Sequence, residues 1–115
     1  MGYRSDVCIA MDSSSKEALD AYCDLEKEIK EHDTVSALIS DACGDNTSSD
    51  GVYKVFWGGI KWYDCHEDIS AMDEFLNYLP CDAYGFIRIG EDTEDIEERG
   101  FPYDFDVYVS RSIEW

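Results

Sequence analysis

Two stretches of helical periodicity separate the strand-like parts of this sequence, and this arrangement restricts the fold more than any other feature. The first helix is predicted over residues 15–32, with a stripe for burial formed by Ala18, Leu19, Tyr22, Leu25, Glu26 and Ile29. The second is predicted over residues 65–79, before Pro80, with the stripe Ile69, Met72, Phe75, Leu76 and Leu79. Both starts have the spacing of a capping box, in Ser14 with Glu17 and in Asp64 with Glu67.

Strands are predicted on either side of these helices. The clearest pattern is a pair of β-rich runs, residues 52–57 and 60–63, separated by Gly58 and Gly59. Because tight hairpin turns favour positive φ at both central residues, the two glycines predict a hairpin. Other strands are predicted at residues 3–11, 84–90 and 105–110. Residues 33–50 are expected to form a loop, with a short helical turn or strand around Val35, Leu38 and Ile39 as the alternative. Residues 91–100 are expected to form a mostly acidic connection, with a helical turn as the alternative.

The element order is therefore strand, helix, two strands, helix, two strands. It predicts an α+β fold in which a mainly antiparallel sheet of about five strands carries two helices on one face. The other face is expected to be open to water or to a partner. A chain of 115 residues, 44 % of them hydrophobic, can build one core but not two ordinary domains, so residues 1–115 are expected to form a single domain.

The charge of the chain excludes several classes of partner. Twenty-seven Asp and Glu oppose nine Lys and Arg, which gives a net charge of −18. Nucleic acids and anionic membranes are bound through Lys and Arg, so direct binding to either is not expected. No apolar run is typical of a membrane helix or a secretory signal, and an odd number of cysteines, five, favours reduced thiols; a cytoplasmic protein is therefore predicted. Basic proteins and divalent cations remain as the electrostatic partners.

Acidic residues are concentrated between Asp64 and Glu98, where twelve of them oppose the single base Arg88. If this segment holds about 30 % of the surface, it carries roughly one net charge per 180 Å². Duplex DNA carries roughly one per 110 Å², so the segment approaches the charge density of nucleic acid. A partner is predicted to bind to Asp64, Glu67, Asp68, Glu91, Asp92, Glu94, Asp95, Glu97 and Glu98. The alternative is an ordinary solvated surface.

Three aromatic residues of the predicted hairpin, Trp57, Trp62 and Tyr63, are candidates for the same interface. Trp and Tyr often dominate the energetics of protein interfaces, and an open sheet face would expose some of them beside the acids. Core packing is nevertheless the favoured interpretation for at least one Trp. Self-association through the same face, as a homodimer, is a competing interpretation.

The sequence lacks the patterns of known catalytic and metal sites. Loops that start at Asp41 and at Asp92 do not have the ligand order of an EF-hand. Cys65, His66 and His32 do not have the spacing of zinc ligands, and the acids around Cys65 disfavour a reactive thiolate. Phosphate-binding and hydrolase motifs are absent. We therefore expect no metal, no cofactor and no enzymatic activity, although an enzyme that uses one of the many carboxylate pairs stays an alternative.

Three patches of the chain resemble a group of small proteins encoded by bacteriophages and prophages. They are residues 1–7 (Met-Gly-Tyr-Arg-Ser-Asp-Val), residues 60–63 (Ile-Lys-Trp-Tyr) and residues 84–92 (Tyr-Gly-Phe-Ile-Arg-Ile-Gly-Glu-Asp). The group has no settled function, so the resemblance assigns no site. It implies a setting, the cytoplasm of a host bacterium, where small acidic phage proteins often inhibit host defence, among them DNA-mimicking anti-restriction and anti-CRISPR proteins.

The leading hypothesis is a phage-type inhibitor whose acidic surface occupies the nucleic-acid-binding groove of a host defence protein. Long-range attraction would speed the encounter and aromatic anchors would set specificity. Two other binding roles stay open: an immunity-like protein that neutralises one basic toxin, and a structural or self-associating phage protein.

Overall fold

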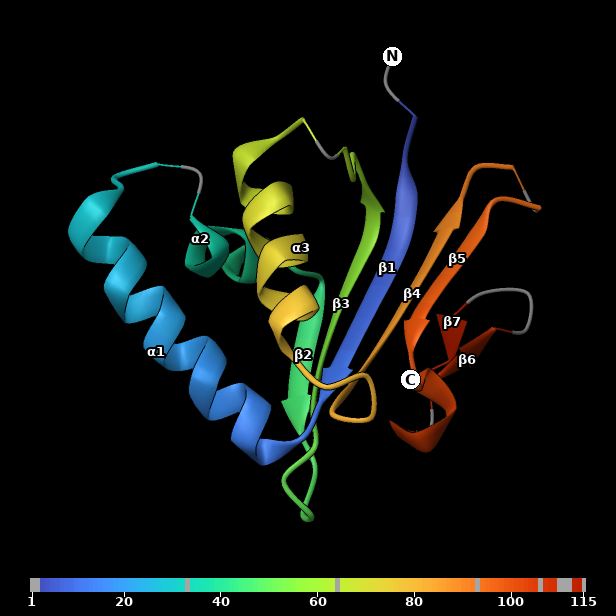
Figure 1. Ribbon diagram of the computed structural model, residues 1–115. Helices are drawn as coiled ribbons and strands as arrows, with labels where there is room; N and C mark the ends of the chain where they lie inside the picture. Colours follow the sequence, from blue (N-terminus) through green and yellow to red (C-terminus); the bar gives the residue numbers. More distant parts are fainter. Residues whose placement is uncertain are drawn as a thin grey trace.

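The computed structural model describes residues 3–32, 34–63, 65–92, 94–105, 107–109 and 113–114. Five antiparallel strands form one sheet in the order β2-β3-β1-β4-β5. The strands of this sheet are β1 (Ser5–Met11), β2 (Gly44–Thr47), β3 (Tyr53–Ile60), β4 (Tyr84–Gly90) and β5 (Ile96–Gly100). The helices are α1 (Ser13–Ile29), α2 (Val35–Ser40) and α3 (Glu67–Tyr78), and all three lie on one face of the sheet (Figure 1). The predicted α+β fold, with two main helices on one face of an antiparallel sheet, is confirmed.

The central strand β1 is buried on both of its sides. Val7, Ile9 and Met11 pack in the core beneath the helices, whereas Cys8 and Ala10 belong to a second core on the opposite face. A strand covered on both faces needs apolar residues at consecutive positions, which is why the sequence from Val7 to Met11 does not alternate. These two cores fix β1 between β3 and β4.

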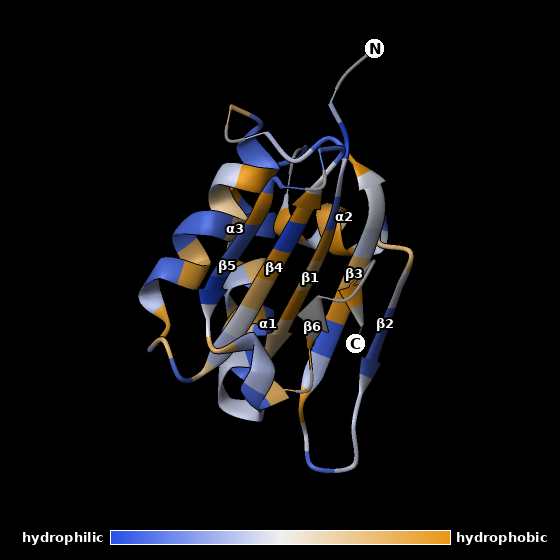
Figure 2. Ribbon diagram, turned by 90° about the vertical axis from the view of Figure 1, so that its right-hand side faces the viewer, coloured by the Kyte–Doolittle hydropathy of each residue, from blue (hydrophilic) through white to orange (hydrophobic). Residues whose placement is uncertain are grey.

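The second face of the sheet is not fully open, contrary to the prediction. The chain after β5 crosses this face as a short 3-10 helix, η1 (Pro102–Phe105), followed by the two-residue strands β6 (Tyr108–Val109) and β7 (Ile113–Glu114) (Figure 2). Phe105, Val107 and Ile113 pack there against Cys8, Ala10 and Ile87. The predicted final strand, residues 105–110, is confirmed only at Tyr108–Val109, since Phe105 belongs to η1. Its expected place in the main sheet is wrong, because β6 pairs with β7.

The two glycines of the predicted hairpin lie inside one continuous strand, β3, so that prediction is wrong. Val7 pairs with Trp57 and Ser5 with Ile60, which leaves Asp6 opposite both glycines. Such a two-against-one arrangement is a β-bulge, and the positive φ of Gly59, 67°, accommodates it. Asp6 Oδ1 accepts a hydrogen bond from Gly59 N (2.9 Å), and Arg4 Nη1 donates to Gly59 O (2.8 Å).

Residues 33–50, predicted to be a loop, contain both α2 and β2. The hairpin partner of β3 is β2, whose register pairs Gly44 with Phe56 and Thr47 with Tyr53. The start of α2 is held by the buried Glu26 of α1, whose Oε1 accepts a hydrogen bond from Val35 N (2.8 Å). A carboxylate at a helix N-terminus is favoured because it meets free N–H groups there.

The ends and buried faces of the two long helices depart from the predictions in detail. The N-cap of α1 is Asp12, whose Oδ1 accepts from Ser15 N (2.8 Å), and not Ser14. Leu25 and Ile29 are 64 % and 80 % exposed because α1 packs along the neighbouring strip of Ser15, Leu19, Tyr22 and Glu26. In α3 the predicted Ile69, Met72, Phe75 and Leu76 are buried, and Leu79 packs against the same core from just beyond the helix. The N-cap of α3 is His66, while Asp64 lies outside the described residues.

No helix in the described ranges is both long and apolar enough to cross a membrane.

Candidate partner-binding surface

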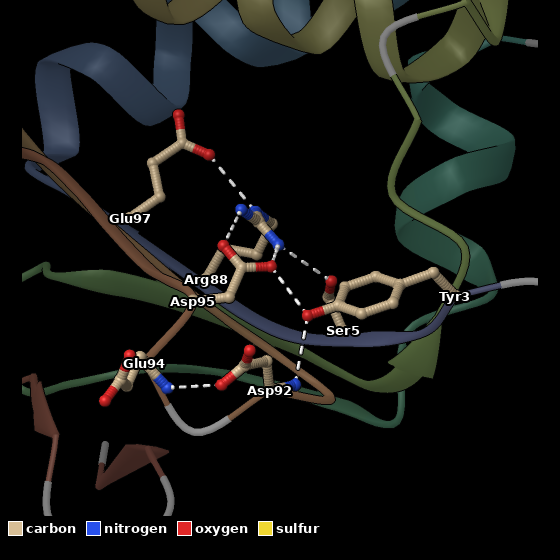
Figure 3. Close-up of polar contacts among 7 residues, drawn as sticks. All are labelled: Tyr3, Ser5, Arg88, Asp92, Glu94, Asp95 and Glu97. Carbon is tan, nitrogen blue, oxygen red and sulfur yellow. Dashed lines mark hydrogen bonds and ion pairs between the residues drawn. The ribbon is translucent and has the colours of Figure 1, made fainter.

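The acidic residues after β4 are organised around one base, Arg88. This residue lies on the helix-facing side of β4, opposite Glu97 of β5. Its guanidinium holds Asp95 with two hydrogen bonds, Nη1 to Oδ2 (3.1 Å) and Nη2 to Oδ1 (2.8 Å), and it contacts Glu97 Oε1 through Nε (3.1 Å). A further bond runs from Nη1 to Ser5 Oγ (3.1 Å) (Figure 3). Bidentate pairing of this kind fixes geometry as well as neutralising charge.

Tyr3 extends this arrangement into the β4–β5 connection. Its hydroxyl donates to Asp95 Oδ2 (2.7 Å) and accepts from Asp92 N (3.0 Å) (Figure 3). Asp92 Oδ1 in turn accepts from Glu94 N (3.0 Å). We name Tyr3, Ser5, Arg88, Asp95 and Glu97 the Arg88 cluster. It ties the segment before β1 to the acidic connection, so the backbone that carries Asp92 and Glu94 is held in place.

The Arg88 cluster makes part of the stability depend on pH. The Arg88 guanidinium, and after it the Tyr3 hydroxyl, lower the pKa of the Asp95 carboxyl below its usual value. The ionised form is therefore favoured by folding, and its contribution is complete above the ordinary Asp pKa of about 4. That contribution is lost as the pH falls through the lowered pKa.

We expect Asp95→Asn to lower the melting temperature by a constant amount from pH 7 down to about 4, and by an amount that shrinks toward zero as the pH falls further through the lowered pKa of Asp95. Thermal unfolding followed by circular dichroism measures both proteins across this range. Asp24→Asn, an equal charge change on the exposed side of α1, is the control and should show no such convergence. A difference from the wild type that stays constant at every pH would mean that the Asp95 side chain acts through packing and not through its charge.

A second base, Arg99 of β5, neutralises part of α3. Its Nη1 donates to Asp73 Oδ1 (2.8 Å), its Nη2 contacts Asn77, and its guanidinium lies over the Phe86 ring at 5.6 Å from the centroid. Asp73, Asp95 and Glu97 are thus already paired within the protein. The free negative charge of the segment is smaller than its composition indicates.

Five of the predicted acids remain exposed along one side of the sheet, and we name them the acidic edge: Glu91, Asp92, Glu94, Glu97 and Glu98. They follow the β4–β5 connection and the first half of β5, which is the last strand of the sheet. Glu97 belongs to both groups, because its side chain meets Arg88 and is still 46 % exposed. Asp95 is engaged in the Arg88 cluster. Glu67 and Asp68 lie apart from this edge, at the start of α3.

The predicted aromatic anchors are mostly in the core. Trp57 is 2 % exposed and its Nε1 donates to Leu38 O (2.8 Å). Trp62, 8 % exposed, packs against Trp57 and Phe86, with ring centroids 5.3 and 6.0 Å away. Core packing, favoured for at least one Trp, is confirmed for both, because both belong to the core beneath the helices. The expected exposure of some of these aromatics therefore does not hold for either Trp. Tyr63 is half-buried, with its ring edge toward His66.

Other apolar side chains are exposed near the acidic edge, and sequence reasoning missed them. Ile96, Phe101 and Tyr103 are 43 %, 48 % and 60 % exposed. Tyr103 OH donates to Glu98 Oε1 (3.3 Å), which places its ring beside the acids. For Phe101 and Tyr103 the available signal was Pro102 between them, since proline is confined to the edges and ends of sheets.

Nothing among the described residues indicates a metal site, since they contain no group of three or more His, Cys, Asp or Glu suited to an ion. The chain matches no family model, no curated protein and no solved structure.

Proposed function

We propose that the protein binds a basic partner protein through the acidic edge and so occupies the surface with which that partner binds nucleic acid. The observation that supports this most is the separation of roles among the acids. Asp95 and Glu97 take up the charge of Arg88, while the other four members of the acidic edge, Glu91, Asp92, Glu94 and Glu98, stay exposed at one sheet margin. A nearby cation that is already paired does not repel a basic partner.

The physical basis is electrostatic steering. Clustered carboxylates attract a basic groove over a distance set by the Debye length, about 8 Å at physiological salt. They would take the places that phosphate groups occupy in the partner's nucleic-acid complex, and the exposed Ile96 and Tyr103 would add apolar contact at the centre. From the resemblance to phage proteins, we propose a host defence protein as the target.

Capture from nuclease-treated bacterial lysate identifies the partner, and the dissociation constant at low and moderate salt then tests the surface. We expect the triple variant Glu91→Gln, Glu94→Gln, Glu98→Gln to bind at least about tenfold more weakly and with a smaller salt dependence. Competing duplex DNA should displace the wild-type protein.

The matched control is Glu17→Gln, Asp24→Asn, Glu28→Gln, which removes the same charge from exposed positions of α1. It should stay within about twofold of the wild type, since charges far from an interface are screened. Equal losses in both triple variants would show that only net charge matters. Unchanged affinity in the first would remove the acidic edge from the proposal.

A further inference from the structure

The strand that carries part of the acidic edge is also the margin of the sheet. Within the described residues β5 has a single neighbouring strand, β4. Two hydrogen bonds, from Gly90 N to Asp95 O (2.8 Å) and from Phe101 N to Tyr84 O (2.9 Å), show that the backbone groups of Asp95 and Phe101 point toward β4. Because antiparallel pairs alternate, Glu97 and Arg99 also direct their backbone groups toward β4, and Glu98 and Gly100 direct theirs outward. The outer side of β5 is thus a template for another strand.

The side chains of β5 determine which strand would fit. Glu97 lies on the helix-facing side with Arg88, and Ile96 and Glu98 lie on the opposite side, so carboxylates stand on both faces of the margin. Antiparallel pairing of β5 with the β5 of a second copy would place Glu97 opposite Glu97, or Glu98 opposite Glu98, in its symmetric central registers. Like charges directly opposite one another are destabilising, so self-pairing is opposed.

The other margin of the sheet is less suitable. Strand β2 has four residues and one carboxylate, Asp45, which already accepts a hydrogen bond from Tyr53 OH (3.0 Å). The charge needed to select a basic segment is therefore concentrated on β5.

We infer that the outer side of β5 takes an extended basic segment of the partner as a sixth strand. This inference rests on the proposed function and specifies the part of the partner involved. Main-chain hydrogen bonds to Glu98 and Gly100 would supply affinity. Basic residues opposite Glu97 and Glu98, one on each face, and an apolar residue opposite Ile96 would supply specificity.

The probe is the capped hexapeptide Thr-Thr-Lys-Lys-Val-Thr, which presents this pattern to β5 in antiparallel register. An NMR titration of the full protein at low salt should perturb the amides of Glu98 and Gly100 and slow their exchange with solvent. The amides of Glu97 and Arg99, which face β4, should change less. A peptide with Glu in place of both Lys should not bind.

Two substitutions of Glu98 separate the contribution of its backbone N–H to peptide binding from the contribution of its carboxylate. Glu98→Gln removes the carboxylate only, whereas Glu98→Pro also removes the outward N–H without affecting the pairing with β4. We expect the proline variant to bind the peptide about tenfold more weakly than the glutamine variant. Thermal unfolding checks that both are folded, and if the proline variant is not, amide exchange in the wild-type protein decides.

Equal affinity of the two variants, with both weaker than the wild type, would overturn strand addition and leave the acidic edge as the binding surface. Peptide binding that is insensitive to every charge substitution would overturn the proposed function as well. Protection of the Glu98 amide at increasing protein concentration without peptide would identify a second copy as the occupant and overturn the inference.

Discussion

Trp57→Ala should lower the free energy of unfolding by about 3–5 kcal/mol, a large part of the stability of a domain of this size. Trp57 is 2 % exposed and packs beside Trp62, so its removal leaves a cavity between β3 and the helices. Its indole Nε1 also donates to Leu38 O in the last turn of α2, where carbonyls have no partner within the helix. Loss of the side chain therefore combines lost burial with a buried acceptor left unsatisfied.

Trp57→Phe separates these two effects. The aromatic ring is kept while the donor to Leu38 O is lost, so an intermediate loss is expected, with about 1–3 kcal/mol from the unsatisfied carbonyl. Urea unfolding followed by circular dichroism measures all three proteins. If the phenylalanine variant is as stable as the wild type, the hydrogen bond to α2 contributes nothing.

Gly85→Ala should lower the free energy of unfolding by about 2–3 kcal/mol, because the backbone of η1 lies against this residue. A Cβ at Gly85 would be 2.3 Å from Pro102 Cα and 2.8 Å from Pro102 N, and backbone atoms cannot move aside as a side chain can. Relief of the overlap requires η1 to shift away from the sheet. That shift would open the second core, where Phe105 covers Ile87.

The control is Gly59→Ala at the β-bulge. A Cβ there meets nothing within 4 Å, so only the positive φ opposes it, at about 1–2 kcal/mol. Urea unfolding gives both losses, and binding of a dye specific for exposed apolar surface reports the opening of the second core. A Gly85→Ala loss no larger than that of Gly59→Ala would mean that η1 is not packed tightly on β4.

The fold class followed from the sequence because the helical stripe of α3 and the apolar run of β1 depend on local spacing alone. The strand order did not, since the same two glycines suit a tight turn or a β-bulge. A tight turn and a β-bulge are distinguished only by the pairing of Ser5 with Ile60 and of Val7 with Trp57, on either side of the glycines. Strand β2 was missed because Gly-Asp-Asn-Thr has the composition of a turn and gains its conformation from β3.

The composition of the candidate surface could be read from the sequence, but its division into roles could not. The acids are evident in the sequence from Glu91 to Glu98. Which of them pair with Arg88, however, depends on the register of β4 with β5. Arg99 lies one residue beyond that run and pairs across to Asp73 of α3, a contact that no local pattern indicates. The burial of Trp57 and Trp62 likewise depends on how the helices cover the sheet.

The central place of β1 has a consequence for how the protein is made. Met11 pairs with Tyr53 on one side and Ser5 with Gly90 on the other, so both neighbours of β1 come much later in the chain. A ribosome adds roughly 5–20 residues per second, so β3 and β4 are synthesised several seconds after this apolar strand. During that time its amides have no native strand to pair with, and the cores on both of its faces are incomplete. Contacts this distant in sequence also slow folding once synthesis is complete.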